Sequence, residues 1–474
     1  MPDALDRARR KAYWRLVPLC FLSYVIAYVD RSNVAIAKLT MSRDLPGFDN
    51  AVIGFGAGVF FLGYFILEIP GTLLVERWSA RLWISRIMVS WGIMAALTAA
   101  VKTPGQFYFV RFLLGLAEAG FYPGVIVYLS HWFTTRDRAR ALAYFFVAAP
   151  VAQVISPKLS NLLLKIGTEE TVNGVVVHHP ALLGLVGWQW VYVGWGIPAV
   201  LLGVLVFFFL TDRPEQAHWL ADDERGALVA ELRREGADRG HHRMKVTEAL
   251  RHPKVLLLCT IYFLVVTGNY GLEFFMPSIL QRWYSLQLDA VTWLVMLPPL
   301  LAVFSQLFMG WSSDRTGERR LHTAVPMLCG ALGLLVATVV RGNLWVTVAA
   351  LMVAAAGFKA YLPSFWSLPN LFLTESAAAG SIGLINSVGN LGGFLGPTVI
   401  GTVEKFSHSF EGGLYFLVVS ATSSAVLVMV LGLGGRPRLE PAPAAPSPPP
   451  SVADAQNRAV ASTPSRRALL RVCG

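Results

Sequence analysis

Long apolar segments, most of them of about 20 residues or more, alternate with short polar connections along most of the chain. A helix needs about 20 apolar residues to cross the hydrocarbon core of a bilayer, and a soluble core has no need of repeated runs of that length. The pattern predicts an all-α membrane protein with twelve membrane-spanning helices. The predicted helices occupy residues 14–39, 51–75, 82–101, 105–131, 140–165, 189–210, 254–281, 290–312, 322–340, 344–372, 380–404 and 413–433.

Longer polar stretches divide the chain into parts. The stretch between the sixth and seventh predicted helices is expected to be a cytoplasmic linker with a short amphipathic helix, and the insertion at 166–188 is expected to be extracytoplasmic. The C-terminal stretch is rich in Pro, Ala and Ser, as disordered segments are. The predicted parts are a cytoplasmic N-terminus (1–13), two six-helix bundles (14–211 and 254–433), the linker (212–253) and a disordered cytoplasmic tail (434–474).

The two predicted bundles share an internal repeat. Pro123 and Pro363 are 240 residues apart, and so are Pro157 and Pro397. The order and direction of the matches indicate parallel repeats. Secondary transporters built in this way bind their substrate between the repeats, near the middle of the bilayer.

Composition and charge narrow the function. Hydrophobic residues make up 55% of the chain and charged residues only 15%, against about 25% charged in a soluble domain. A soluble enzyme and a disordered protein are therefore excluded. Lys and Arg gather in alternate loops, while the opposite loops hold few, among them Lys38 and Lys405. Because basic loops mark the cytoplasmic side, both termini are predicted to be cytoplasmic. The net charge of +11 then reflects topology and not a nucleic-acid partner.

The sequence contains no nucleotide-binding, zinc-protease, CxxC or nucleophile-elbow motif. We therefore expect no enzyme, no cofactor and no metal. Four charges lie within predicted helices instead, namely Asp30, Arg31, Arg111 and Glu118. An ionisable group at the bilayer centre costs several kcal/mol, so each is a functional candidate. We expect the two acids and the two arginines to share a cavity, where an acid carries a proton and an arginine binds a carboxylate. The alternative is a purely structural network of buried ion pairs.

Several motifs resemble those of one family. They are YVDRSN at 28–33, RFLLGLAEAGFYPG at 111–124, GWSSDRTGERR at 310–320 and INSVGN at 385–390. Together they are similar to the signatures of the anion:cation symporters of the major facilitator superfamily. The branch with tartrate, phthalate and 4-hydroxyphenylacetate permeases is the most similar one. The resemblance implies two pseudo-symmetric six-helix bundles and proton-coupled uptake of an organic anion by alternating access.

The resemblance also implies roles for single residues. Asp30 and Glu118 would be the proton-coupling acids, Arg31 would hold the substrate carboxylate, and Arg111 would partner Glu118. Substrate contacts are expected from Tyr28, Tyr64, Ser367, Asn386 and Asn390. Tyr64 as a packed aromatic, and the two asparagines as links between helices, remain alternatives. The expected gating residues in the cytoplasmic loops are Glu76, Arg77, Arg81, Asp314, Arg315 and Arg319.

The chain departs from the family pattern in three places. Ala149 stands where some sugar-acid transporters carry Gln, which argues against a sugar-acid substrate. Residues 193–196 replace a more usual Glu-Gly pair, and Glu273 stands at a position expected to be uncharged.

In the internal repeat, Lys359 falls within a residue of the counterpart of Glu118. Glu273 falls within a few residues of the counterpart of Asp30. We expect both Glu273 and Lys359 to face the cavity, to pair when it is empty and to tune specificity, with Lys359 free to hold a second carboxylate. Snorkelling toward an interface is the alternative.

The expected function is proton-coupled symport of a small carboxylate (tartrate-like, a dicarboxylate or an aromatic acid) by a monomer in the cell membrane. An exporter of the same fold and a receptor that binds the anion without moving it are the alternatives. The coupling ion, H⁺ or Na⁺, and the direction of transport stay open.

Overall fold

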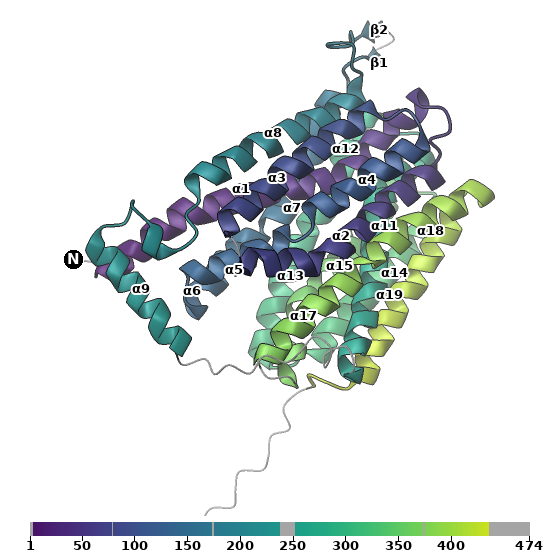
Figure 1. Ribbon diagram of the computed structural model, residues 1–474. Coiled ribbons are helices and arrows are strands. Elements are labelled where there is room, and N and C mark those ends of the chain that lie inside the picture. The colour runs from purple at the N-terminus through teal and green to yellow at the C-terminus, as the bar shows by residue number, and fades with distance from the viewer. Residues whose placement is uncertain (1–2, 78, 173–174, 238–251, 373–374, 436–474) are drawn as a thin grey trace, which may run out of the picture. The chain divides into compact units, whose positions relative to one another are not determined.

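The computed structural model describes residues 3–77, 79–172, 175–237, 252–372 and 375–435 (Figure 1). The predicted disordered tail lies almost entirely outside them. In hydrocarbon every backbone polar group must be satisfied within the chain, so the apolar segments fold as helices. The N-terminal helices are α1 (Ala4–Asp44), α2 (Asn50–Arg77), α3 (Ala80–Leu97), α4 (Pro104–Glu118), α5 (Phe121–Trp132), α6 (Thr135–Phe146), α7 (Ala148–Leu164) and α8 (Gly187–Phe209).

The C-terminal helices follow a connecting helix, α9 (Asp222–Ala237). They are α11 (Pro253–Tyr284), α12 (Leu288–Leu294), α13 (Leu297–Thr316), α14 (Arg320–Val339), α15 (Leu344–Ala360), α16 (Leu362–Phe365), α17 (Glu375–Asn390), α18 (Gly392–Ser407) and α19 (Glu411–Leu431). The only strands in the described part are β1 (Glu169–Val172) and β2 (Val175–His178), an antiparallel hairpin within the predicted 166–188 insertion.

The all-α fold is confirmed, with breaks that the apolar pattern did not reveal. Within the described residues, eleven helical spans are long and apolar enough to cross a membrane. The predicted eleventh helix is divided at Leu391 into α17 and α18, which together supply the twelfth. The predicted fourth helix is divided where Gly120 adopts the left-handed conformation, with φ 83°. Glycine takes this conformation without the steric cost that a side chain would bring.

The first helix begins earlier than predicted. Residues 4–13 were expected to form a polar terminus, but they extend α1 toward the connecting helix α9. Lys11 Nζ lies 2.7 Å from Glu224 Oε2, and Arg7 Nη2 lies 2.6 Å from Asp223 Oδ2. The hydrogen bond from Lys11 holds the pKa of Glu224 below its ordinary value. These pairs attach α9 to the start of α1, and α9 is the amphipathic helix expected in the linker.

Glycines allow α2 and α18 to pack backbone against backbone. A Cβ atom at Gly54 would lie 2.4 Å from the carbonyl oxygen of Pro397, and one at Gly401 would lie 2.1 Å from that of Asn50. Small residues of this kind let membrane helices approach closely. The contact joins the N-terminal to the C-terminal helices at the end of the molecule that carries the β1–β2 hairpin, which we call the hairpin end.

Polar pairs reinforce the contact between the two sets of helices at the hairpin end. Asn50 donates to Glu404 at 2.9 Å, and Lys405 Nζ lies 3.0 Å from Asp49 Oδ2. Lys38, assigned to a loop by the sequence, is buried in α1 instead. Its Nζ lies 3.6 Å from the ring centre of Phe275, a cation–π contact across the same boundary.

Asp289 at the start of α12 forms a second link across this boundary. Its carboxylate accepts from Lys165 at 2.8 Å and from Asn161 of α7, and Lys158 lies 3.7 Å away. Lys158 is therefore part of this link, and it also lies 4.8 Å from the ring centre of Trp293. The hairpin end is thus closed by two groups of contacts on different helices.

The backbone contact at Gly401 yields a prediction. Gly401→Val would drive a side chain into the backbone of Asn50, which cannot rotate away, so the hairpin end should open. A cysteine at Ala35, which lines the pocket below the closure, should then react several-fold faster with a membrane-impermeant maleimide applied to intact cells, in a background without native cysteines.

Gly105→Val is the matched control, because no atom lies within 4 Å of its added Cβ. It should leave labelling unchanged. Equal labelling rates in both variants would contradict the assignment of Gly401 to the closure.

Candidate functional site

A short ion pair between α1 and α4 lies at the centre of the N-terminal helices. Arg31 Nη2 and Nε lie 2.5 and 2.6 Å from the same oxygen, Oε1 of Glu118. Glu118 is the last residue of α4 and is 0% exposed. Its second oxygen, Oε2, has no hydrogen-bond partner among the described residues. The pair is therefore short and buried, and one of the two carboxylate oxygens has no hydrogen bond from the described residues. Such an arrangement is costly for an ion pair with a purely structural role.

Aromatic rings surround the Arg31 guanidinium. Its central carbon lies 4.9 Å from the ring centre of Tyr64 and 5.7 Å from that of Phe60. The Tyr64 hydroxyl and the Tyr270 hydroxyl also interact with the guanidinium. Ring faces attract cations and exclude water, so the charge of Arg31 is stabilised without being hydrated.

Asp30 and Arg111 are the other two charges that the sequence singled out. Asp30 is buried; its Oδ1 accepts from Asn33 at 3.0 Å, whereas Oδ2 has no partner within the described part of the chain. Arg111 is buried with its guanidinium carbon 5.2 Å from the ring centre of Phe60, and it interacts electrostatically with Asp30 and Glu118. Its three nitrogens have no hydrogen-bond partner in the described residues.

Arg111 and Glu118 make no direct contact in the structure, contrary to the predicted pairing. All four charges, Asp30, Arg31, Arg111 and Glu118, nevertheless gather in one place. Arg111 and Glu118 lie seven residues apart on one helix, about 10 Å along its axis, which exceeds a direct contact. Glu118 instead reaches across to α1 and pairs with Arg31.

A buried acid that the sequence analysis did not single out lies on α2. Asn386 of α17 donates to Glu68 Oε1 at 2.5 Å, and Asn390 and Ser387 lie beside the same carboxylate. Glu68 stands inside the apolar run 51–75, so the rule that picked out Asp30 could have found it. The two asparagines thus share one helix face, as expected, and face a carboxylate of the N-terminal helices.

A second polar cluster joins α1 and α7 to α11 and α15 around the Tyr28 hydroxyl. This oxygen accepts from Gln153 at 2.7 Å and from Lys359 at 3.3 Å, and it donates to Glu273 at 3.4 Å. Lys359 Nζ and Glu273 Oε2 lie 3.9 Å apart. The structure brings Glu273 and Lys359 together, as expected, with the Tyr28 hydroxyl between them.

The fifth predicted helix contains a glutamine that faces this cluster, although position 149 is Ala. Gln153 lies four residues later, one turn along α7, and it also donates to Glu273 at 3.3 Å. The argument against a sugar-acid substrate rests on position 149 alone and stays a prediction.

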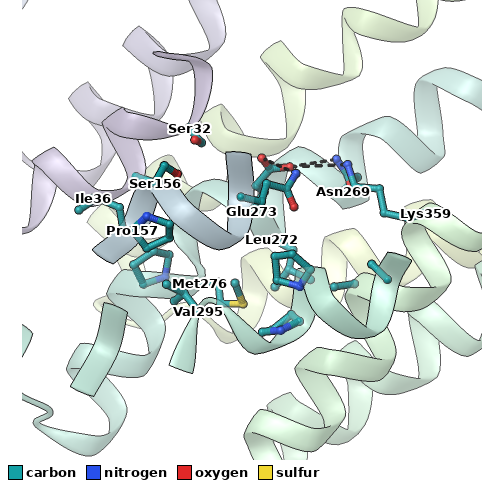
Figure 2. Close-up of a pocket in the computed structure, with 17 residues that line it drawn as sticks. Ser32, Ile36, Ser156, Pro157, Asn269, Leu272, Glu273, Met276, Val295 and Lys359 are labelled. Atoms are coloured by element: carbon teal, nitrogen blue, oxygen red, sulfur yellow. Dashed lines mark hydrogen bonds and ion pairs between the residues drawn. The ribbon is translucent and has the colours of Figure 1, made fainter. Parts of the chain in front are cut away.

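One pocket borders this cluster (Figure 2). Its polar side consists of Ser32, Gln153, Ser156, Asn269, Glu273 and Lys359. The rest of its wall is apolar and consists mainly of Leu272, Met276, Pro277, Val295, Pro298, Pro299 and Ala302. The pocket therefore combines an acid and a base with a broad apolar surface.

Other predicted site residues lie outside this pocket. The Ser367 hydroxyl donates to the carbonyl of Ser364 at 2.7 Å. Arg319 pairs with Asp314 at 2.6 Å across the turn between α13 and α14, and Arg315 lies over the Trp311 ring of its own helix.

In the corresponding N-terminal loop, the backbone N–H of Arg81 donates to Asp212 at 2.8 Å. The side chains of Glu76 and Arg77, at the end of α2, lie outside the described residues.

The helical fold and the polar pocket between two sets of helices define a membrane transporter. The Major Facilitator Superfamily model matches residues 20–397. A protein of Agrobacterium vitis named "Putative tartrate transporter" is 41% identical over 90% of this chain and 92% of its own. The quinolone resistance transporter of Acinetobacter baumannii is 34% identical over 89% of this chain and 94% of its own. The chain belongs to the major facilitator superfamily, whose members transport small molecules and are not enzymes.

Solved structures agree on the fold. A bacterial homologue of the human lysosomal transporter Spinster, in an inward-facing and occupied conformation, superposes with a TM-score of 0.69 at 15% identity, over 88% of this chain and 96% of its own. A D-xylose–proton symporter superposes with a TM-score of 0.68 at 12% identity, over 88% of this chain and 97% of its own.

The charge cluster yields a prediction on stability. Arg111→Met should lower the free energy of unfolding by about 3–5 kcal/mol, because it removes the cation that acts most strongly on the buried carboxylate of Asp30. Adding Asp30→Asn should recover part of the loss, with a coupling energy of about 0.5–3 kcal/mol. Denaturation of the purified protein in detergent measures both, and strictly additive effects would show that the two charges do not interact.

Proposed function

We propose that this protein is a secondary active transporter that carries a small organic anion together with protons by alternating access. The observation that carries the proposal is the Arg31–Glu118 pair, buried among rings with Asp30 and Arg111 beside it. A membrane protein keeps such charges in its core at a cost of several kcal/mol, and proton relays and anion sites are the usual reason.

In the proposed mechanism, Glu118 and Asp30 take up protons from one side of the membrane. A protonated Glu118 no longer holds both nitrogens of Arg31 as a carboxylate does. The guanidinium is then free to bind the substrate carboxylate through two parallel hydrogen bonds, the geometry in which arginine is strongest. The loaded site carries less net charge, so it can be exposed to the other side at lower cost.

The remaining contacts to substrate are proposed for the cluster around Tyr28. Gln153 and the Tyr28 hydroxyl offer a donor and an acceptor, and Lys359 offers a second cation. Tyr64, Asn386 and Asn390 would complete the site next to Arg31 and Glu68. Ser367 would join only after a change of shape, since its hydroxyl now bonds within its own turn.

Alternating access is supported by the way the two sets of helices meet. The hairpin end is closed by the α2–α18 packing and by the links at Asp289 and Glu404. Opening that end while the opposite end closes would expose the site to each side in turn. The Asp314–Arg319 turn and its N-terminal counterpart near Arg81 would bias the opposite end. We place both termini in the cytoplasm and the protein, as a monomer, in the cell membrane.

The class of substrate rests on the buried cations and on the relatives. Two of the relatives are named for tartrate, a small dicarboxylate. An exporter of the same fold would use the same site with the gradients reversed, and a receptor that only binds would show no movement of substrate.

Reconstitution in proteoliposomes tests the proposal. Uptake of labelled tartrate, other hydroxydicarboxylates and aromatic monocarboxylates is measured with an imposed pH gradient, with a Na⁺ gradient and with neither. Accumulation of at least one acid that depends on the pH gradient supports the proposal. Failure to accumulate or exchange any organic anion would refute it, and binding without movement would favour the receptor.

The coupling acids yield a prediction of their own. Asp30→Asn and Glu118→Gln should each abolish accumulation driven by the pH gradient while exchange of labelled for unlabelled anion survives, because exchange needs no net proton movement. Accumulation that persists in both variants would contradict the assignment. Glu231→Gln in α9, an acid-to-amide change outside the membrane helices, is the control.

A further inference from the structure

The pocket in Figure 2 contains one acid and one base that are held close but not joined. Glu273 Oε2 and Lys359 Nζ are 3.9 Å apart, beyond a hydrogen bond, and the Tyr28 hydroxyl contacts both. Glu273 also accepts from Gln153 at 3.3 Å and from Asn269 at 3.4 Å. The two charges thus balance each other while both remain on the pocket wall.

This balance restricts what can bind. A plain anion that docks on Lys359 draws the only cation of the described pocket lining away from Glu273. That carboxylate then keeps only its interaction with Arg31, which does not line the pocket. A buried charge that loses its partner is strongly destabilised. A ligand with two carboxylates fares worse, because its second charge meets Glu273 directly. A ligand that brings its own cation to Glu273 satisfies both groups at once.

The two charges of such a ligand must lie close together, because Glu273 Oε2 and Lys359 Nζ are only 3.9 Å apart. The rest of the wall indicates what else the ligand carries. Leu272 and Met276 of α11 and Val295, Pro298 and Pro299 beyond it present an apolar surface. A polyol or a hydroxydicarboxylate would lose hydration against this surface without gaining hydrogen bonds. A hydrocarbon or aromatic body would gain from the contact.

We propose that the preferred substrate is an ampholyte: a carboxylic acid with an apolar or aromatic body and a cationic N–H group next to its carboxylate. The carboxylate binds Lys359, with Arg31 as the second cation of the site, and the N–H cation binds Glu273. This inference rests on the proposed transport of an organic anion and specifies which anions the pocket selects.

Three benzoates that differ only at the ortho position test it. Ortho-(aminomethyl)benzoate carries an ammonium beside its carboxylate, ortho-methylbenzoate is neutral there, and phthalate carries a second carboxylate. Inhibition of labelled anion uptake in proteoliposomes gives the apparent affinity of each. In the wild type the aminomethyl compound should bind at least about tenfold more tightly than the methyl compound, the least that one charge-assisted hydrogen bond supplies. Phthalate should bind most weakly.

We expect Glu273→Gln to reverse the order of the three apparent affinities. The amide keeps the size of the side chain but removes its charge, so the affinity for the aminomethyl compound should fall about tenfold or more, while phthalate gains because Lys359 is released to hold a second carboxylate. Glu231→Gln is the control and should keep the wild-type order. If Glu273→Gln is poorly folded, Glu273→Asp serves instead and should weaken the aminomethyl compound while keeping the wild-type order.

The outcomes separate this inference from the proposed function. If no benzoate and no other organic anion is bound or moved, the transporter proposal itself fails. If anions are transported but the three compounds bind equally, or their order is the same with and without the charge at 273, the ampholyte inference is overturned and organic-anion transport stands.

Discussion

A single ion pair, Arg31 with Glu118, constrains the rest of this membrane protein. Both groups are buried among apolar helices, where an isolated charge costs several kcal/mol, so neither can be left without the other. The pair ties α1 to the end of α4, whose last residue is Glu118. The left-handed Gly120 that follows lets the chain turn there and resume as α5. Aromatic rings and the neighbouring charges surround the pair.

The two sets of helices use the same plan with different chemistry. In the N-terminal set a charged residue, Glu118, ends α4 just before the break to α5. In the C-terminal set Lys359 lies one residue before the end of α15, just ahead of α16. The repeat therefore places an acid and a base at related positions in the two sets of helices. Glu118 pairs with an arginine, whereas Lys359 lies with Glu273 beside an apolar surface.

Closure at the hairpin end depends on backbone contacts as much as on ion pairs. Glycines 54 and 401 let α2 and α18 touch, and polar links at Asp289 and Glu404 add to that contact. Partly exposed ion pairs, such as Lys165 with Asp289, contribute little each, about 0–1 kcal/mol. Close packing of the two backbones contributes more than these ion pairs do, but it cannot be deformed gradually. An interface of both kinds is suited to two discrete arrangements, closed and open, and not to a continuous range.

The sequence by itself determined the membrane class, the helical fold, the repeat and most of the buried charges, because apolar length and the cost of intramembrane charge depend only on local composition. Tertiary structure decided the partners. Arg31 reached Glu118 and Arg111 did not, Gln153 and not position 149 faced the pocket, and Lys38 was buried and not in a loop. Which side chains meet depends on how helices cross and where they break, and a one-turn shift along a helix changes neither its composition nor its hydrophobic pattern.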